Sequence, residues 1–229
     1  MKRLLLLLVL IIFVVAQTGC KSTGAAKSVK TLPQVKKVAV VSLSVSDWGG
    51  SVKAGGIGDS MHQTMQKATD GLLTYTEKEL AKQFTVTKAS SFIGSKGYKG
   101  QTEKLTLTAY VPSVGGKPLG VFTSESRSLK RGDLTPAKAM ALCKSLGVDG
   151  IFLIFSEWGV ATGKFVPTNK ALTKNIVSLW DASGQKVFTR RVDKVGTRVL
   201  GGMGYKAVTP ETITEWTDTY KHSLVQILK

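Results

Sequence analysis

The alternation of hydrophobic and polar positions after residue 35 predicts a series of strands and helices. An apolar run at residues 38–45, with hydrophobic residues on both strand faces, and a continuous apolar run at residues 151–155 are typical of strands in a sheet that is covered on both faces. Apolar residues at helical spacing predict helices over residues 59–83, over residues 135–146 and from residue 209 onward. Weaker strand patterns occur at residues 86–93, 104–111, 119–123, 176–180 and 187–195. These elements predict the α/β fold class: a single domain, residues 35–229, with a mixed β-sheet, about three helices packed on it and two β-hairpins.

Local signals indicate where several of these elements turn or end. Thr135 and Pro136 are residue types preferred at the N-cap and at the first position of a helix, and Gly147 is a type that ends one. The turn of the first hairpin is expected at Gly115 and Gly116. The Asp-Ala-Ser-Gly sequence of residues 181–184 predicts the turn of the second hairpin.

The first 20 residues predict an export signal rather than a folded element. Lys2 and Arg3 precede an apolar run over residues 4–15. Its 12 residues span about 18 Å as a helix, which is short of the roughly 20 residues that a membrane-spanning helix needs. The small residues before Cys20 resemble the lipobox of bacterial lipoproteins, although Gln17 stands where that motif usually has an aliphatic residue. We therefore expect cleavage before Cys20 and acyl chains on this cysteine.

This interpretation divides the chain into a signal peptide over residues 1–19, a lipidated flexible tether over residues 20–34, and the α/β domain. The tether is expected to be flexible because it is rich in Ser, Ala, Gly and Lys. The alternative is cleavage after Val14-Val15-Ala16, which suits ordinary signal peptidase and would release a soluble protein.

The composition is strongly basic, with 32 Lys and Arg against 15 Asp and Glu, a formal charge of +17. Without residues 1–19 the chain still carries +15. Export removes nucleic acid as a partner, and leaves anionic lipid head groups, lipopolysaccharide phosphates and peptidoglycan carboxylates. The expected partners are therefore the membrane, through the acylated Cys20, and an envelope protein or peptidoglycan. The sequence leaves oligomerisation open.

The densest basic cluster lies on the strand expected at residues 187–195 and on its flanks. It consists of Lys186, Arg190, Arg191, Lys194 and Arg198. We expect it to solubilise or guard the edge of a sheet, and a dedicated anion site is the less favoured alternative.

The chain does not predict a metal site or a cofactor. Cys143 falls on the apolar stripe of the helix at residues 135–146, where a free cysteine acts as a small hydrophobe. His62, His222 and this core thiol do not assemble a zinc site. The glycines before residue 59 match neither nucleotide-binding pattern, since Ala54 follows Lys53 and the third glycine of a dinucleotide motif is missing. No catalytic set is complete, so a binding role is expected over an enzymatic one.

Two segments resemble a group of bacterial envelope domains. They are ALCKSLGVDGIFLIF at residues 141–155 and VSLWDASGQKVF at residues 177–188. The group includes the amino-terminal domain of the Tol translocation protein, the curli-secretion lipoprotein, and the outer-membrane lipoprotein that activates penicillin-binding proteins. The resemblance implies a non-enzymatic module that is lipid-anchored in the outer membrane, faces the periplasm and binds envelope proteins. Lys21 is compatible with outer-membrane sorting. A pore is the less favoured alternative, because the alternating segment at residues 105–111 is shorter than the ~9–11 residues of a membrane strand.

An acid followed by tryptophan ends each of the two strongest strands. Asp47 and Trp48 follow the first, and Glu157 and Trp158 follow the second. Ligands of open α/β sheets bind at the carboxyl ends of the strands, so these four residues are candidate ligand-binding residues. The rings could stack on a sugar while the acids accept hydroxyl hydrogens, or the acids could hydrolyse a glycan. The ordinary alternative is that the tryptophans cover the sheet.

Overall fold

The computed structural model describes residues 28–29, 32–47, 59–105, 109–163, 168–201 and 210–229. The strands are β1 Lys37–Asp47, β2 Thr85–Thr87, β3 Ala109–Tyr110, β4 Ser113–Val114, β5 Lys117–Pro118, β6 Gly150–Thr162, β7 Asn169–Asp181 and β8 Lys186–Val195. The helices are α2 Asp59–Leu80, α3 Ala89–Phe92, α4 Lys96–Lys99, α5 Ser126–Arg131, α6 Pro136–Leu146 and α7 Ile213–Leu228.

The main sheet is mixed and has the order β2-β1-β6-β7-β8. β1 is parallel to β2 and to β6, whereas β6, β7 and β8 form an antiparallel meander. β3 pairs antiparallel with the far end of β1, and β4 and β5 form a separate small hairpin. The α/β fold class with a mixed sheet, its helices and its hairpins is therefore confirmed.

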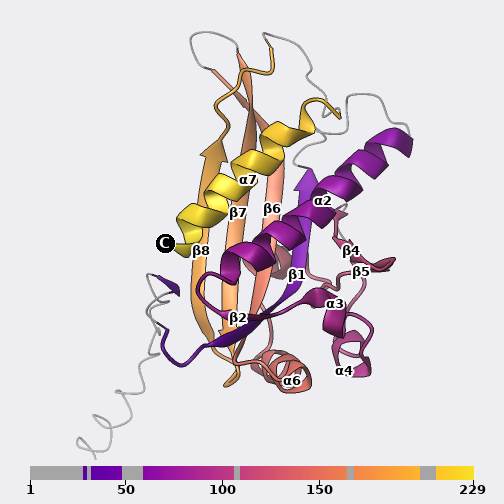
Figure 1. Ribbon diagram of the computed structural model, residues 1–229, viewed down its shortest axis with the longest axis vertical. Coiled ribbons are helices and arrows are strands. Elements are labelled where there is room, and N and C mark those ends of the chain that lie inside the picture. The colour runs from indigo at the N-terminus through magenta and orange to yellow at the C-terminus, as the bar shows by residue number, and fades with distance from the viewer. Residues whose placement is uncertain (1–27, 30–31, 48–58, 106–108, 164–167, 202–209) are drawn as a thin grey trace, which may run out of the picture.

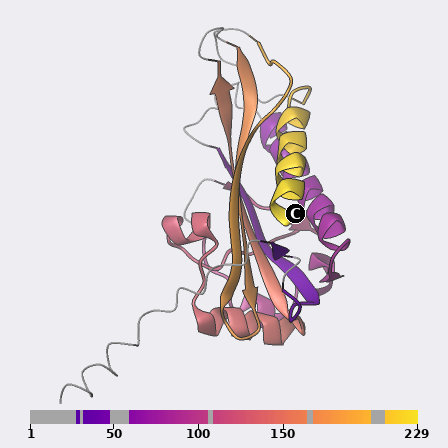
Figure 2. The same ribbon diagram turned by 90° about the vertical axis from the view of Figure 1, so that its left-hand side faces the viewer.

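Helices lie on both sides of the sheet. α2 and α7 cross one face side by side, and we call this the α7 face (Figure 1). α5 lies on the opposite side, which we call the α5 face (Figure 2). α6 packs at the end of the sheet where the β7–β8 turn lies, since an added Cβ at Gly184 would meet the carbonyl oxygen of Pro136 at 2.7 Å. The sheet is thus buried on both faces along much of its length.

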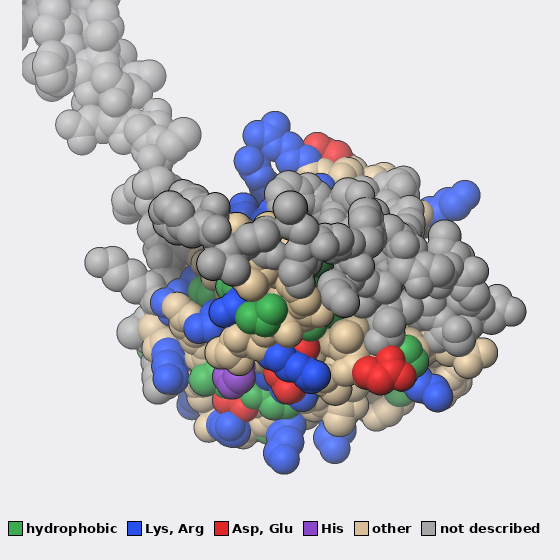
Figure 3. Space-filling model, turned by 90° about the horizontal axis from the view of Figure 1, so that it is seen from above, with side chains coloured by type: hydrophobic (Ala, Val, Ile, Leu, Met, Phe, Trp, Pro, Cys, Tyr) green, Lys and Arg blue, Asp and Glu red, His purple; other side chains and the backbone are tan. Residues whose placement is uncertain are grey.

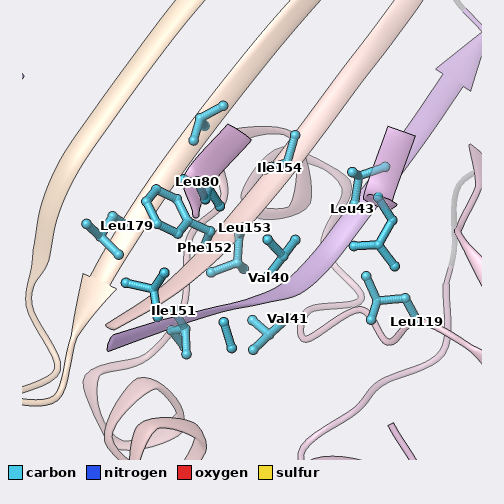
Figure 4. Packing of buried hydrophobic residues seen from close by; sticks show 14 of the residues in the cluster. Val40, Val41, Leu43, Leu80, Leu119, Ile151, Phe152, Leu153, Ile154 and Leu179 are labelled. Carbon is cyan, nitrogen blue, oxygen red and sulfur yellow. The ribbon is translucent and has the colours of Figure 1, made fainter. Parts of the chain in front are cut away.

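The core forms where β1 and β6 run side by side. Val40 and Leu43 of β1 lie beside Phe152 and Ile154 of β6, with Leu80 at the end of α2 above them (Figure 4). Residues 38–41 of β1 and residues 151–152 of β6 are fully buried. The apolar runs therefore predicted strands covered on both faces correctly, and the two serines within the β1 run, Ser42 and Ser44, are buried with their apolar neighbours.

Local signals set the ends of α6 and the turn between β7 and β8. The Thr135 hydroxyl accepts a hydrogen bond from the backbone N–H of Lys138 at 3.3 Å, and Gly147 ends the helix at φ 60°. The Asp181 carboxylate accepts from the N–H groups of Ser183 and Gln185, both at 3.0 Å. These predictions are confirmed.

Other predicted boundaries are wrong. The strand expected at residues 86–93 is β2 followed directly by the short helix α3. Among the described residues of the hairpin expected over residues 104–123, which leave out residues 106–108, the structure has β3, the β4–β5 turn and an isolated bridge between Glu103 and Val121. β6 and β7 are longer than predicted, because they pair with each other over their whole length. This pairing satisfies the hydrogen-bonding backbone N–H and C=O groups even at positions whose side chains do not favour a strand.

Part of the expected tether packs on the folded domain. Val29, Leu32 and Val35 are buried, and the Ser28 hydroxyl donates to the backbone oxygen of Lys229 at 3.0 Å. Three apolar side chains within seven positions suffice to dock this stretch, although its other residues are polar. The described residues of this stretch therefore pack on the domain, and the domain boundary at residue 35 stays a prediction.

Cys143 should resist thiol reagents in the folded protein. Its side chain is buried, and this burial, followed by the charges of Asp181 and Asp149, raises its pKa to about 12. The folded state then holds the thiol proton more tightly than the unfolded chain, so this contribution to stability is complete below the unfolded pKa near 9 and is lost as pH rises towards 12. In the variant Cys20→Ser, which keeps Cys143 as its one thiol, labelling with a disulfide reagent at pH 8 should be slow without denaturant and fast with it. Rapid native labelling would contradict the buried position.

Candidate functional site

The two acid–Trp sequences lie on neighbouring strands. β1 and β6 are parallel, and the register pairs Ser46 with Glu157 and Asp47 with Trp158. The prediction that the two sequences lie side by side is therefore correct for the backbone, but Glu157 and Trp158 do not end their strand: β6 continues to Thr162. The side chain of Asp47 and the whole of Trp48 lie outside the described residues. Their part in a ligand site, and the separation of the two carboxyl groups, stay predictions.

Trp158 does not face solvent. Its ring is fully buried, and its Nε1 donates to the Ser156 hydroxyl at 2.9 Å. The chain of hydrogen bonds continues from Ser156 to Asn175 at 2.5 Å and from Asn175 to Thr173 at 3.0 Å. All of these side chains are buried. The proposal that the Trp158 ring stacks on a sugar is therefore corrected: this tryptophan covers the sheet, which was the ordinary alternative.

Glu157 points to the α5 face, opposite to its neighbour Trp158, because side chains alternate along a strand. Its Oε1 accepts from Lys174 Nζ at 3.0 Å, and the two side chains are only 15% and 17% exposed. Both border a pocket of about 230 Å³ between α5 and the strands β6, β7 and β8. We call this the cationic pocket. Its lining residues are Arg127, Lys130, Arg131, Phe155, Glu157, Lys174, Ile176 and Arg191.

The backbone at the end of α5 is fixed against β7. Gly132 ends the helix at φ 59°, and Ser178 Oγ donates to the carbonyl oxygen of Arg131 at 2.9 Å. Trp180 Nε1 donates to the carbonyl oxygen of Gly132, also at 2.9 Å. A Cβ at Gly132 would lie 2.7 Å from Ser178 Oγ, so the close approach requires glycine. Leu129 packs against Phe155 on the sheet side of the helix. These contacts hold the basic residues of α5 above the sheet.

The cations of the pocket fall into two groups. Lys174 is paired with Glu157, and Arg191 is paired with Asp193 at 2.8 Å. The hydrogen bond to Asp193 raises the pKa of Arg191, and the charge of Glu157 adds to this rise. Within the described part of the chain, the side chains of Arg127, Lys130 and Arg131 form no ion pair. The pocket is therefore strongly positive, and its positive charge is concentrated on α5.

Two larger hollows carry less charge. One of about 650 Å³ lies where residues 29–36 meet residues 81–85, and one of about 470 Å³ lies among residues 93–121. The first is lined by a single charged residue, Lys36. The second combines Lys99, Lys117 and Glu103 with mostly apolar side chains. The small cationic pocket gathers the most ionisable groups, and we take it as the candidate site.

Sequence reasoning found this site only in part. It identified Glu157, and it placed Arg191 in the basic cluster of the edge strand. β8 is indeed an edge strand of the sheet. Arg127, Lys130, Arg131 and Lys174 were missed. The available signal was three basic residues within the five positions before Gly132, with no acid among them.

The rest of the positive charge is diffuse. Seen from above, Lys and Arg side chains are scattered over the visible surface rather than gathered in one patch (Figure 3). None of the helices in the described ranges has the length and apolar character to span a bilayer.

The fold and the site define the class of this protein. It is an α/β domain with a mixed sheet and a cationic pocket on one face. No protein-family model matches the sequence, and no curated protein matches it. Solved structures with a similar fold include lipoprotein GNA1162 from Neisseria meningitidis, with 9% identity and a TM-score of 0.39 over 83% of this chain and 99% of that one. The hypothetical protein CT253 from Chlamydia trachomatis has 10% identity and a TM-score of 0.41, over 85% and 94% of the two chains. A PelC dodecamer structure from Paraburkholderia phytofirmans has 13% identity and a TM-score of 0.32, over 85% and 87%. These are distant likenesses of architecture, and no activity follows from them.

Proposed function

We propose that this chain is a lipid-anchored binding module of the bacterial envelope that holds an anionic partner in the cationic pocket. The observation that carries the proposal is the set of three α5 cations above a pocket on the sheet, none of which forms an ion pair with another described residue. Cationic side chains fixed next to a pocket raise the local concentration of anions and bind them through charge-assisted hydrogen bonds. An exported protein meets such anions as phosphates and carboxylates of the envelope.

The position of the N-terminal segment supports anchoring close to a membrane. Ser28 is fixed to the end of α7, and eight residue steps separate it from Cys20. A fully extended chain spans at most ~3.3–3.6 Å per residue, so the domain would stay within about 29 Å of an acylated Cys20. We propose the periplasmic face of the outer membrane as the location, on the basis of the export signal and Lys21.

Removing the three α5 charges should abolish specific binding to envelope material. The test uses the mature full-length chain with Cys20→Ser, so that acylation does not contribute, and the triple variant Arg127→Gln, Lys130→Gln, Arg131→Gln. Co-sedimentation with purified envelope fragments at about 0.15 M salt should fall at least tenfold, because only close or partly buried charges stay effective at this ionic strength.

The matched control removes the same charge elsewhere, with Lys67→Gln, Lys78→Gln and Lys144→Gln. These three lysines are exposed on α2 and α6. The control should sediment like the parent protein. An equal loss in both triple variants would show that binding is spread over the whole basic surface and would refute the site.

A further inference from the structure

One carboxylate lies among the cations of the pocket. A carboxylate repels an anion, so a site that bound only a simple anion would gain no affinity from it. Glu157 borders the same 230 Å³ as five Lys and Arg side chains. Lys174 is its hydrogen-bond partner within the described residues, and the bond uses Oε1 alone. A carboxylate has two oxygens and about four acceptor positions, so Oε2 can accept further hydrogen bonds. A ligand that suits this pocket therefore combines an anionic group with hydrogen-bond donors.

We propose that the cationic pocket binds a phosphorylated sugar, with its phosphate at the α5 cations and a sugar hydroxyl at Glu157. This inference rests on the proposed binding function and names its ligand class. A phosphate ester carries about −1.5 to −2 charges at pH 7 and three strong acceptor oxygens. Arg127 and Arg131 offer planar forks of donors that match phosphate oxygens. The sugar hydroxyls supply the donors that Glu157 lacks.

The walls and the size of the pocket agree with this ligand. Phe155 and Ile176 provide an apolar floor between the charged groups, which suits the C–H face of a sugar ring. The volume of about 230 Å³ is below the ~300–1,000 Å³ of pockets for drug-sized molecules, so one sugar unit with its phosphate fits better than a nucleotide or a larger cofactor.

Simpler ligands use only part of the site. Inorganic phosphate would be attracted by α5 but repelled by Glu157, and it could offer this carboxylate only the P–OH of an anion rather than the hydroxyls of a neutral sugar ring. A neutral sugar would satisfy Glu157 and leave the α5 cations unused. The sugar phosphate should therefore bind more tightly than either component.

Calorimetric titration of the unacylated full-length mature chain tests this order. The probes are glucose 6-phosphate, inorganic phosphate and glucose. We expect glucose 6-phosphate to bind at least tenfold more tightly than inorganic phosphate, and glucose to give no measurable binding. Equal affinities for both phosphates would overturn the proposal.

The variant Glu157→Gln separates this role from a structural one. Loss of the negative charge should strengthen binding of inorganic phosphate, whereas the advantage of glucose 6-phosphate over phosphate should fall about tenfold. Arg131→Gln should weaken both phosphates, and Lys67→Gln on the α7 face should change neither. A change of the same direction and size for both ligands in Glu157→Gln would contradict a hydroxyl contact. The melting temperatures of all variants show whether each one is folded.

The variant Lys174→Met provides a second test, because it also breaks the ion pair but keeps Glu157. It should weaken the binding of both glucose 6-phosphate and inorganic phosphate.

The same chemistry could come from a soluble sugar phosphate or from the head group of a membrane glycolipid. Phosphatidylcholine vesicles with a phosphorylated glycolipid should bind the protein if the source is a lipid, and vesicles with phosphatidylglycerol at equal charge should not. Equal binding to both vesicles, without binding of glucose 6-phosphate, would overturn the proposal that the ligand is a phosphorylated sugar. If the α5 triple variant still loses envelope binding in that case, the anionic site stands and only its ligand changes. If it does not, both proposals fail.

Discussion

Cys20→Ser is expected to abolish acylation and to move the protein from the membrane to the soluble fraction. The acyl chains are the strongest link to the bilayer that we expect, because the three chains of a bacterial lipoprotein anchor far more firmly than a single chain, which binds only marginally. Metabolic labelling with a fatty acid analogue and fractionation of cells measure both effects. The soluble variant should keep the thermal stability of the wild type, since Cys20 lies eight positions before the first described residue.

Cleavage at the alternative site would be recognised from the N-terminus of the mature protein and from the absence of lipid. A wild-type protein that begins at Gln17 and carries no lipid would show that ordinary signal peptidase cuts after Ala16. Anchoring would then be refuted, while binding at the cationic pocket would remain open to test.

Trp158→Ala is expected to destabilise the domain rather than to alter binding of a glycan. The ring is fully buried and its Nε1 donates to Ser156. Truncation of a buried Trp typically costs about 3–5 kcal/mol, because a cavity remains. For a domain of this size each kcal/mol lowers the melting temperature by ~2–4 °C, so a fall of roughly 6–20 °C should appear in a thermal melt.

Trp158→Phe is the matched control. It keeps much of the apolar volume and removes the hydrogen-bond donor, so a smaller loss of about 1–3 kcal/mol is expected. An unchanged melting temperature in Trp158→Ala, together with weaker peptidoglycan sedimentation, would restore the stacking role that the buried position argues against. Trp48→Ala still tests the predicted contribution of the other tryptophan.

The parts of the fold that depend on local chemistry could be predicted from the sequence. The helix after Thr135 has a cap, a proline and a terminal glycine, and each acts within one turn. The runs in β1 and β6 are apolar on both faces, and only a doubly covered strand buries both. The second hairpin depends on Asp181 and Gly184, which are three positions apart.

The parts that depend on distant partners were not predictable. β7 extends beyond its apolar residues because β6 pairs with it, and the buried residues at 29–35 are too few to be distinguished from a tether. The site has the same limitation. Arg131 and Arg191 are 60 positions apart, and only the packing of α5 against β7 brings them to one pocket. Trp158 and Glu157 are adjacent in sequence but face opposite sides of the sheet, so the pair could not form one cleft.

The buried hydrogen bonds around Asn175 also constrain how β6 and β7 can align. Alternation of side chains excludes a slip by one residue, because it would turn the apolar face outward. A slip by two residues keeps every side chain on its own face, so apolar packing alone discriminates weakly against it. It would, however, break the buried hydrogen bond between Ser156 and Asn175, although each residue keeps its partner on its own strand, Trp158 and Thr173. The same slip would part Lys174 from Glu157 on the other face. The polar side chains inside the sheet thus select the one alignment in which the cationic pocket is assembled.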